Sequence, residues 1–182
     1  MEKRTVSAPA RRGMSVSDLI LVAVLLAAGA VLKYFAGSII NIAGMKPNFI
    51  IAMYCLAILL IRPRLHESLI IGLLAGAVCQ LFPGTPYINL ISEVCGAAVM
   101  GLMVKLPMMS AQNKLVSTAA NALAAFVSTV VSGGVFTVCL FLVLDAAATA
   151  MAAYVPIVLC TAIFNAVIVS LLALPLKAAL HR

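Results

Sequence analysis

Long apolar runs separated by short polar segments follow one another along this chain. A helix needs about 20 mainly apolar residues to cross the hydrocarbon core of a bilayer. The runs therefore predict six membrane-spanning helices, at 18–35, 47–61, 68–82, 87–104, 115–144 and 149–176. Because the runs lack the alternating polar and apolar positions of a transmembrane barrel, the predicted fold class is all-α.

Composition agrees with an integral membrane protein. Hydrophobic residues make up 65% of the 182 residues and charged residues only 9%, a balance outside the range of soluble domains. The net charge is +7, but the basic residues lie in tails and short loops and form no basic stripe with interleaved aromatics. We therefore expect a membrane as the surroundings of this protein and no nucleic acid as a partner.

The basic residues also predict an orientation, since cytoplasmic segments of membrane proteins carry an excess of lysine and arginine. With a cytoplasmic N-terminus, six spans return the C-terminus to the cytoplasm and leave Lys33 and Lys46 outside. The ten other basic residues are then inside: Lys3, Arg4, Arg11, Arg12, Arg62, Arg64, Lys105, Lys114, Lys177 and Arg182. The predicted organisation is a basic cytoplasmic tail at 1–17, a membrane domain at 18–176 and a cytoplasmic tail at 177–182, in the cell membrane.

Motifs for metal binding, cofactors and catalysis are missing from the sequence. The five cysteines lie singly in apolar surroundings without a CxxC pair, and the two histidines are far apart, so we expect no metal site. Paired aspartates, HExxH and a well-placed serine–lysine dyad are absent, which argues against an enzyme. The phosphate loop GxxxxGK[ST] is absent as well, so the chain is not expected to bind ATP in that way.

Two charged residues lie inside or next to long apolar runs, where a lipid-facing helix rarely carries a charge. Lys46 directly precedes the second apolar run, and Glu93 lies inside the fourth. A charge at membrane depth costs roughly 2.5–3.5 kcal/mol, so it usually faces a protein interior or a watery cavity. Lys46 either extends to the headgroups or is held in a cavity by a loop at 37–44. Glu93 is either a structural group or, with Lys46, a partner for a zwitterion.

Other polar residues share the depth of Glu93. The turn FPGTPY at 82–87 starts the fourth helix, which places Asn89 one turn before Glu93 on the same face. Ser132 in the fifth run and Asn165 in the sixth are at a similar depth. Such side chains often only bond neighbouring helices, so a structural interpretation stands beside the binding-site one.

Small residues recur at helical spacing in two of the runs. Ala23, Ala27 and Ala30 form a stripe in the first, and Gly72 and Gly76 are four apart in the third. Small side chains let two helices approach closely. These faces pack either within the protein or against a second membrane protein.

Four segments carry a resemblance to a known family. They are GMKPNFIIAMYCLAILLIRPR at 44–64, FPGTPYINLISE at 82–93, VSGGVF at 131–136 and VLCTAIFNAV at 158–167. In this order they resemble the tryptophan-transporter branch of the S components, the substrate-binding membrane subunits of energy-coupling-factor (ECF) transporters. The GMKP motif is the most specific. The branch pattern has aspartate where this chain has Asn48 and Glu93, and proline where it has Ile88.

The resemblance implies a division of labour among several chains. The S component binds its solute from outside, here tryptophan, while a transmembrane coupling subunit and two ATPase subunits drive uptake. It also implies that Ala23 and Ala27 contact the coupling subunit. The alternatives are an S component for a vitamin or another aromatic solute, and a structural membrane subunit without transport activity.

The expected binding site combines both lines of reasoning. Lys46 would hold the carboxylate of an amino acid and Glu93 its ammonium group. Hydrogen-bonding groups and apolar walls would come from Asn48, Phe49, Met53, Asn89, Ser132, Phe136 and Asn165.

Overall fold

The computed structural model describes residues 13–39, 47–82, 87–144 and 148–180. In these ranges the chain forms six α-helices and one short 3-10 helix and contains no strand. The elements are α1 (Val16–Ile39), α2 (Ile50–Ile61), α3 (Leu65–Cys79), α4 (Ile88–Met103), η1 (Pro107–Ser110), α5 (Lys114–Leu144) and α6 (Ala148–Ala179). The predicted all-α fold with six helices is confirmed. Most of the predicted N-terminal tail lies outside the described residues.

The helices fall into two length classes. By length and apolar composition, α1, α5 and α6 each contain a segment able to cross a membrane: Val16–Phe35, Lys114–Val143 and Met151–Ala179. The helices α2, α3 and α4 are equally apolar in character but have only 12, 15 and 16 residues. At 1.5 Å per residue α2 is about 18 Å long, which is less than the roughly 30 Å of a hydrocarbon core.

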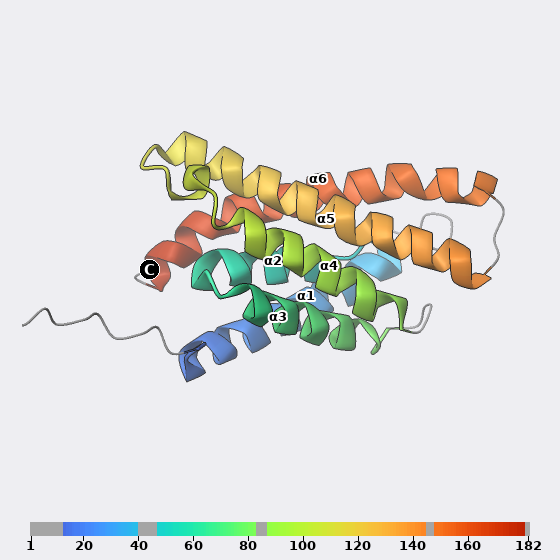
Figure 1. Cartoon of the computed structure of the whole chain (residues 1–182), viewed down its shortest axis with the longest axis horizontal. Helices are drawn as coiled ribbons and strands as arrows, with labels where there is room; N and C mark the ends of the chain where they lie inside the picture. The colour runs from blue at the N-terminus through green and yellow to red at the C-terminus, as the bar shows by residue number, and fades with distance from the viewer. Residues whose placement is uncertain (1–12, 40–46, 83–86, 145–147, 181–182) are drawn as a thin grey trace, which may run out of the picture.

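The short helix α2 forms the centre of the bundle. All twelve of its residues are buried, as expected of a helix that is apolar on every side. It packs against the five other helices. The long helices α5 and α6 run side by side, α4 packs on α5, and α3 packs on α4 (Figure 1). The start of α1 and the C-terminus lie at the same end of the bundle (Figure 1).

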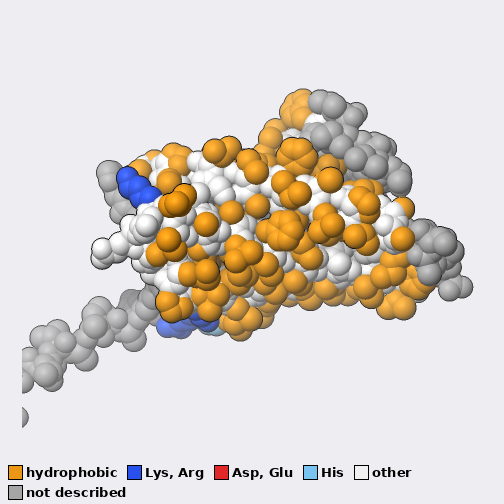
Figure 2. All heavy atoms as spheres, turned by 90° about the horizontal axis from the view of Figure 1, so that it is seen from above, with side chains coloured by type: hydrophobic (Ala, Val, Ile, Leu, Met, Phe, Trp, Pro, Cys, Tyr) orange, Lys and Arg blue, Asp and Glu red, His pale blue; other side chains and the backbone are white. Residues whose placement is uncertain are grey.

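The outer surface suits a lipid environment. Large apolar side chains of α1, α3, α5 and α6 are exposed along the bundle, among them Leu73, Leu142 and Leu171. Figure 2 shows hydrophobic side chains over most of one face, with the visible Lys and Arg side chains gathered at one end. That end is the one at which α1 starts and α6 ends (Figures 1 and 2).

Two helix starts differ from the predicted ones by three residues, and the others by one or two. The second helix was predicted to begin at Pro47, but α2 begins at Ile50, because the Asn48 Oδ1 atom accepts the Ile50 N–H at 3.3 Å. The third begins at Leu65, three residues before the predicted start. There the Glu67 carboxylate accepts the backbone N–H of Arg64 at 2.7 Å and stabilises the first turn.

Glycines set the spacing between helices. A Cβ atom on Gly72 or Gly76 would come within 2.8 Å of a backbone oxygen of α4. Gly29 of α1 likewise packs on Met53 of α2. The small residues of α3 therefore serve packing inside the bundle. Ala23 and Ala27 of α1, in contrast, lie on its exposed face.

Candidate functional site

A buried carboxylate stands at the meeting point of α2, α4 and α5. Glu93 of α4 is only 1% exposed. Its Oε1 atom accepts a short hydrogen bond from Nδ2 of Asn48, and its Oε2 atom accepts one from Oγ of Ser132 at 3.1 Å. Asn48, just before α2, and Ser132 of α5 thus both contact Glu93 of α4 directly, as expected of residues of one site.

Asn48 is fixed in place by both ends of its side chain. Its Oδ1 atom accepts the first free N–H of α2, so its Nδ2 atom is turned toward Glu93. An aspartate, which the branch pattern has at this position, would lack that N–H donor and would place a second carboxylate beside the first. The amide at position 48 therefore supplies a hydrogen-bond donor to the carboxylate at position 93.

Asn165 of α6 also contacts this cluster, through the backbone of Asn48. It is fully buried, and its Nδ2 atom donates to the backbone oxygen of Asn48 at 3.2 Å and to Oγ1 of Thr129 at 3.3 Å. Within the described part of the chain its Oδ1 atom has no hydrogen-bond partner. A buried acceptor without a donor is costly, so this oxygen is available to a donor group of a bound molecule.

The structure adds Lys33 and Cys79 to this group, neither of which the sequence analysis singled out. The Nζ atom of Lys33 lies 3.3 Å from Sγ of Cys79 and 5.3 Å from the centre of the Phe82 ring. The same sulfur is 3.8 Å from Oε1 of Glu93. Lys33 was predicted to lie in the first apolar run, and it lies within α1, which continues to Ile39.

A signal for Lys33 was present in the sequence. Lys33 is the one basic residue of the first apolar run, and the reasoning applied to Glu93 applies equally to it. Cys79 carried no such signal, because a lone cysteine in an apolar run is typical of core packing.

Tyr54 completes the surroundings of Glu93 from α2. It is fully buried, and its hydroxyl lies 3.5 Å from Oγ of Ser128. Gly96, one turn after Glu93 along α4, leaves room for this hydroxyl. A Cβ atom there would overlap the Tyr54 oxygen and lie 2.9 Å from Cβ of Ser132.

The other described residues that were expected at the site are Phe49, Met53, Phe136 and Asn89. Phe49 is buried at the start of α2, and Met53 is buried against α1. Phe136 is half-buried one turn beyond Ser132 on α5. Asn89 is half-buried one turn before Glu93, and no hydrogen bond joins its side chain to Glu93 within the described residues. Lys46 lies outside the described residues, as does most of the loop expected at 37–46, whose first three residues belong to α1.

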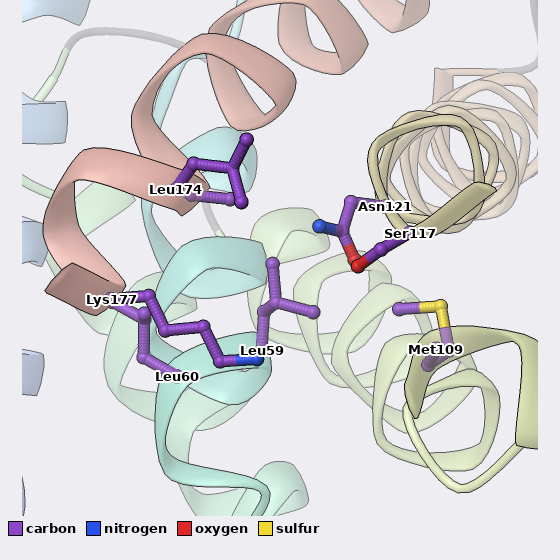
Figure 3. Close-up of a pocket in the computed structure, with 8 residues that line it drawn as sticks. Leu59, Leu60, Met109, Ser117, Asn121, Leu174 and Lys177 are labelled. Carbon is purple, nitrogen blue, oxygen red and sulfur yellow. The ribbon is translucent and has the colours of Figure 1, made fainter. Parts of the chain in front are cut away.

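A separate cleft lies at the opposite end of the bundle. It is lined by the last turn of α2, the first turns of α5 and the end of α6, together with Met109. The amide of Asn121 points into this cleft, with Ser117 and Lys177 at its edges (Figure 3). This cleft is remote from Glu93, which lies near the other end of α2.

Comparison with known families identifies the chain. The family described as "Tryptophan transporter TrpP" matches residues 15–181, which covers all of the helical bundle. The chain belongs to the TrpP family. The resemblance drawn from the four sequence segments is thereby confirmed, and this TrpP-family chain is a multi-pass membrane protein of a transporter family and not itself an enzyme. No curated protein and no solved structure matches the chain.

Proposed function

We propose that the protein is the S component of an ECF-type importer and binds tryptophan from outside the cell. Uptake would be driven by ATP hydrolysis in two ATPase subunits that act through a transmembrane coupling subunit. Membership of the TrpP family supports the transport of tryptophan. The observation that carries the binding mode is the buried Glu93 carboxylate, held by Asn48 and Ser132.

The carboxylate of Glu93 would bind the ammonium group of the amino acid. A buried charge without an opposite charge costs several kcal/mol, so an incoming cation is favoured at this position. The hydroxyl of Ser132 and the amide of Asn48 keep both carboxylate oxygens oriented before the ligand arrives. The free Oδ1 atom of Asn165 would accept a further N–H of the ligand.

The side chain of the ligand needs apolar surroundings. Phe49, Met53 and Phe136 are the residues proposed to contact the indole ring, since aromatic and methionine side chains suit a flat polarisable group. Asn89 lies one turn before Glu93 on α4 and would line the entrance to the proposed binding site. We propose Lys46, at the entrance to α2, as a partner of the ligand carboxylate.

The proposed assembly uses the exposed face of α1. Ala23 and Ala27 are exposed there and would contact the coupling subunit, in keeping with the close approach that small side chains allow. All six helices would lie within the cell membrane, with both termini on the cytoplasmic side. The shared location of the chain ends in Figure 1 supports this topology.

The absence of tryptophan from the chain provides a direct binding test. With excitation selective for indole, only the ligand is observed when free tryptophan is added to purified protein in detergent. A saturable blue shift, with protection from a soluble quencher, supports the proposal. Competition by tyrosine, phenylalanine and thiamine ranks the alternatives. A spectrum that does not change at any protein concentration would refute binding of tryptophan.

A further inference from the structure

Lys33 brings a positive charge close to Glu93 from the helix that is proposed to face the coupling subunit. It is half-buried within α1, with its ammonium group directed to Cys79 on α3 and to the Phe82 ring. Holding a lysine in this position removes it partly from water, and partly buried lysines normally have an opposite charge nearby. Glu93 is the nearby opposite charge, since the sulfur of Cys79 contacts both the ammonium group of Lys33 and the carboxylate of Glu93.

Lys33 and Glu93 are close but not in direct contact. No salt bridge with an N···O distance of 4.0 Å or less joins them within the described residues. The sulfur of Cys79 contacts both, 3.3 Å from Nζ and 3.8 Å from Oε1, so the two charged atoms are separated by no more than the sum of these distances. The opposite charges therefore lie close together, with the Cys79 thiol as a shared neighbour.

A zwitterion is the class of ligand that such a pair of opposite charges recognises. Its ammonium group satisfies an anion and its carboxylate satisfies a cation, and each pair forms charge-assisted hydrogen bonds of about 2.7–2.9 Å. A ligand with only one of these groups would leave either Lys33 or Glu93 without a partner. The penalty for an unpartnered buried charge then discriminates against it.

We propose that Lys33 is a residue of the substrate site that binds the carboxylate of the amino acid. In the empty protein it balances the charge of Glu93, and on binding the ligand's ammonium group takes over that role while Lys33 turns to the ligand's carboxylate. This inference rests on the proposed function and adds a specificity residue to it. It also links ligand binding to the proposed contact with the coupling subunit, because Lys33 lies on the same helix as Ala23 and Ala27.

The test compares three ligands on wild-type protein and on Lys33→Gln. The ligands are tryptophan, tryptamine, which lacks the carboxylate, and indole-3-propionate, which lacks the amine. Removal of the Lys33 charge should weaken tryptophan binding by about 10- to 100-fold. Tryptamine, which has no carboxylate for Lys33 to hold, should bind as tightly as to wild type or more tightly. Lys33→Arg, which keeps the charge, should retain tryptophan binding within a few-fold.

Controls separate this inference from the proposed function and from a structural role. Lys105→Gln removes an exposed lysine and should bind all three ligands like wild type. Equal losses for tryptophan and tryptamine in Lys33→Gln would show a merely structural lysine and overturn the inference, as would unchanged tryptophan binding. Either result leaves tryptophan binding by the wild-type protein intact. If the wild-type protein binds no tryptophan, the proposed function is refuted, and the inference about Lys33 is refuted with it.

Discussion

Replacing Glu93 by glutamine removes one charge while keeping the shape of the side chain. The carboxylate accepts hydrogen bonds from Asn48 and Ser132. A glutamine can keep its oxygen toward Asn48, and its NH₂ group can donate to Ser132, because a hydroxyl both donates and accepts. The variant should therefore fold, but its melting temperature should be lower than that of wild type, because Lys33 loses the opposite charge that it faces in the empty site.

The expected cost to binding follows from the lost ion pair. Removing one partner of a buried, hydrogen-bonded charge pair at a binding site costs about 2–5 kcal/mol. At 1.4 kcal/mol for each factor of ten, a loss of about 2–5 kcal/mol corresponds to an increase in the Kd for tryptophan of about 30- to 4,000-fold. Indole-3-propionate has no ammonium group and should lose no affinity.

Titration of indole fluorescence measures this change directly. Glu67→Gln is the matched control, because Glu67 is also buried but accepts the backbone N–H groups of Arg64 and Met14 at the start of α3. It should lower the melting temperature and leave the Kd for tryptophan unchanged. A Glu93→Gln protein that is folded and binds tryptophan with wild-type affinity would refute the assignment of Glu93 to the ammonium group.

Two further predictions test packing and assembly. Gly96→Ala should destabilise the bundle by about 1–3 kcal/mol, because its Cβ atom would overlap the Tyr54 hydroxyl, whereas Gly134→Ala, with no atom within 4 Å of its Cβ position, should be neutral or stabilising. Thermal unfolding in detergent compares the two, and equal melting temperatures would contradict the packing at Gly96. The double variant Ala23→Leu with Ala27→Leu should abolish co-purification with the coupling subunit while tryptophan still binds. Normal co-purification would exclude this face of α1 as the contact.

The helices were predictable because their apolar runs are long and clearly bounded. The predicted starts of α5 and α6 lie within one residue of the observed ones. The starts of α2 and α3 were missed by three residues because side-chain caps from Asn48 and Glu67 set them, and hydropathy does not report such local hydrogen bonds.

Part of the candidate binding site was predictable, because several polar residues lie at a similar depth in different apolar runs. That reasoning selected Glu93, Ser132 and Asn165, and the structure places Asn48 in contact with both Glu93 and Asn165. It missed Lys33 because the residue lies toward the outer end of its run, where a lysine usually extends to the headgroups. Only the packing of α1 beside α3 shows that its side chain turns inward.

A structure of the protein with tryptophan bound tests the central claim most directly. The account predicts the ligand's nitrogen within about 2.7–2.9 Å of a Glu93 carboxylate oxygen, the distance of a charge-assisted hydrogen bond. Tryptophan bound elsewhere, for example in the cleft beside Asn121 and Lys177 (Figure 3), with no ligand atom in contact with Glu93, would contradict it.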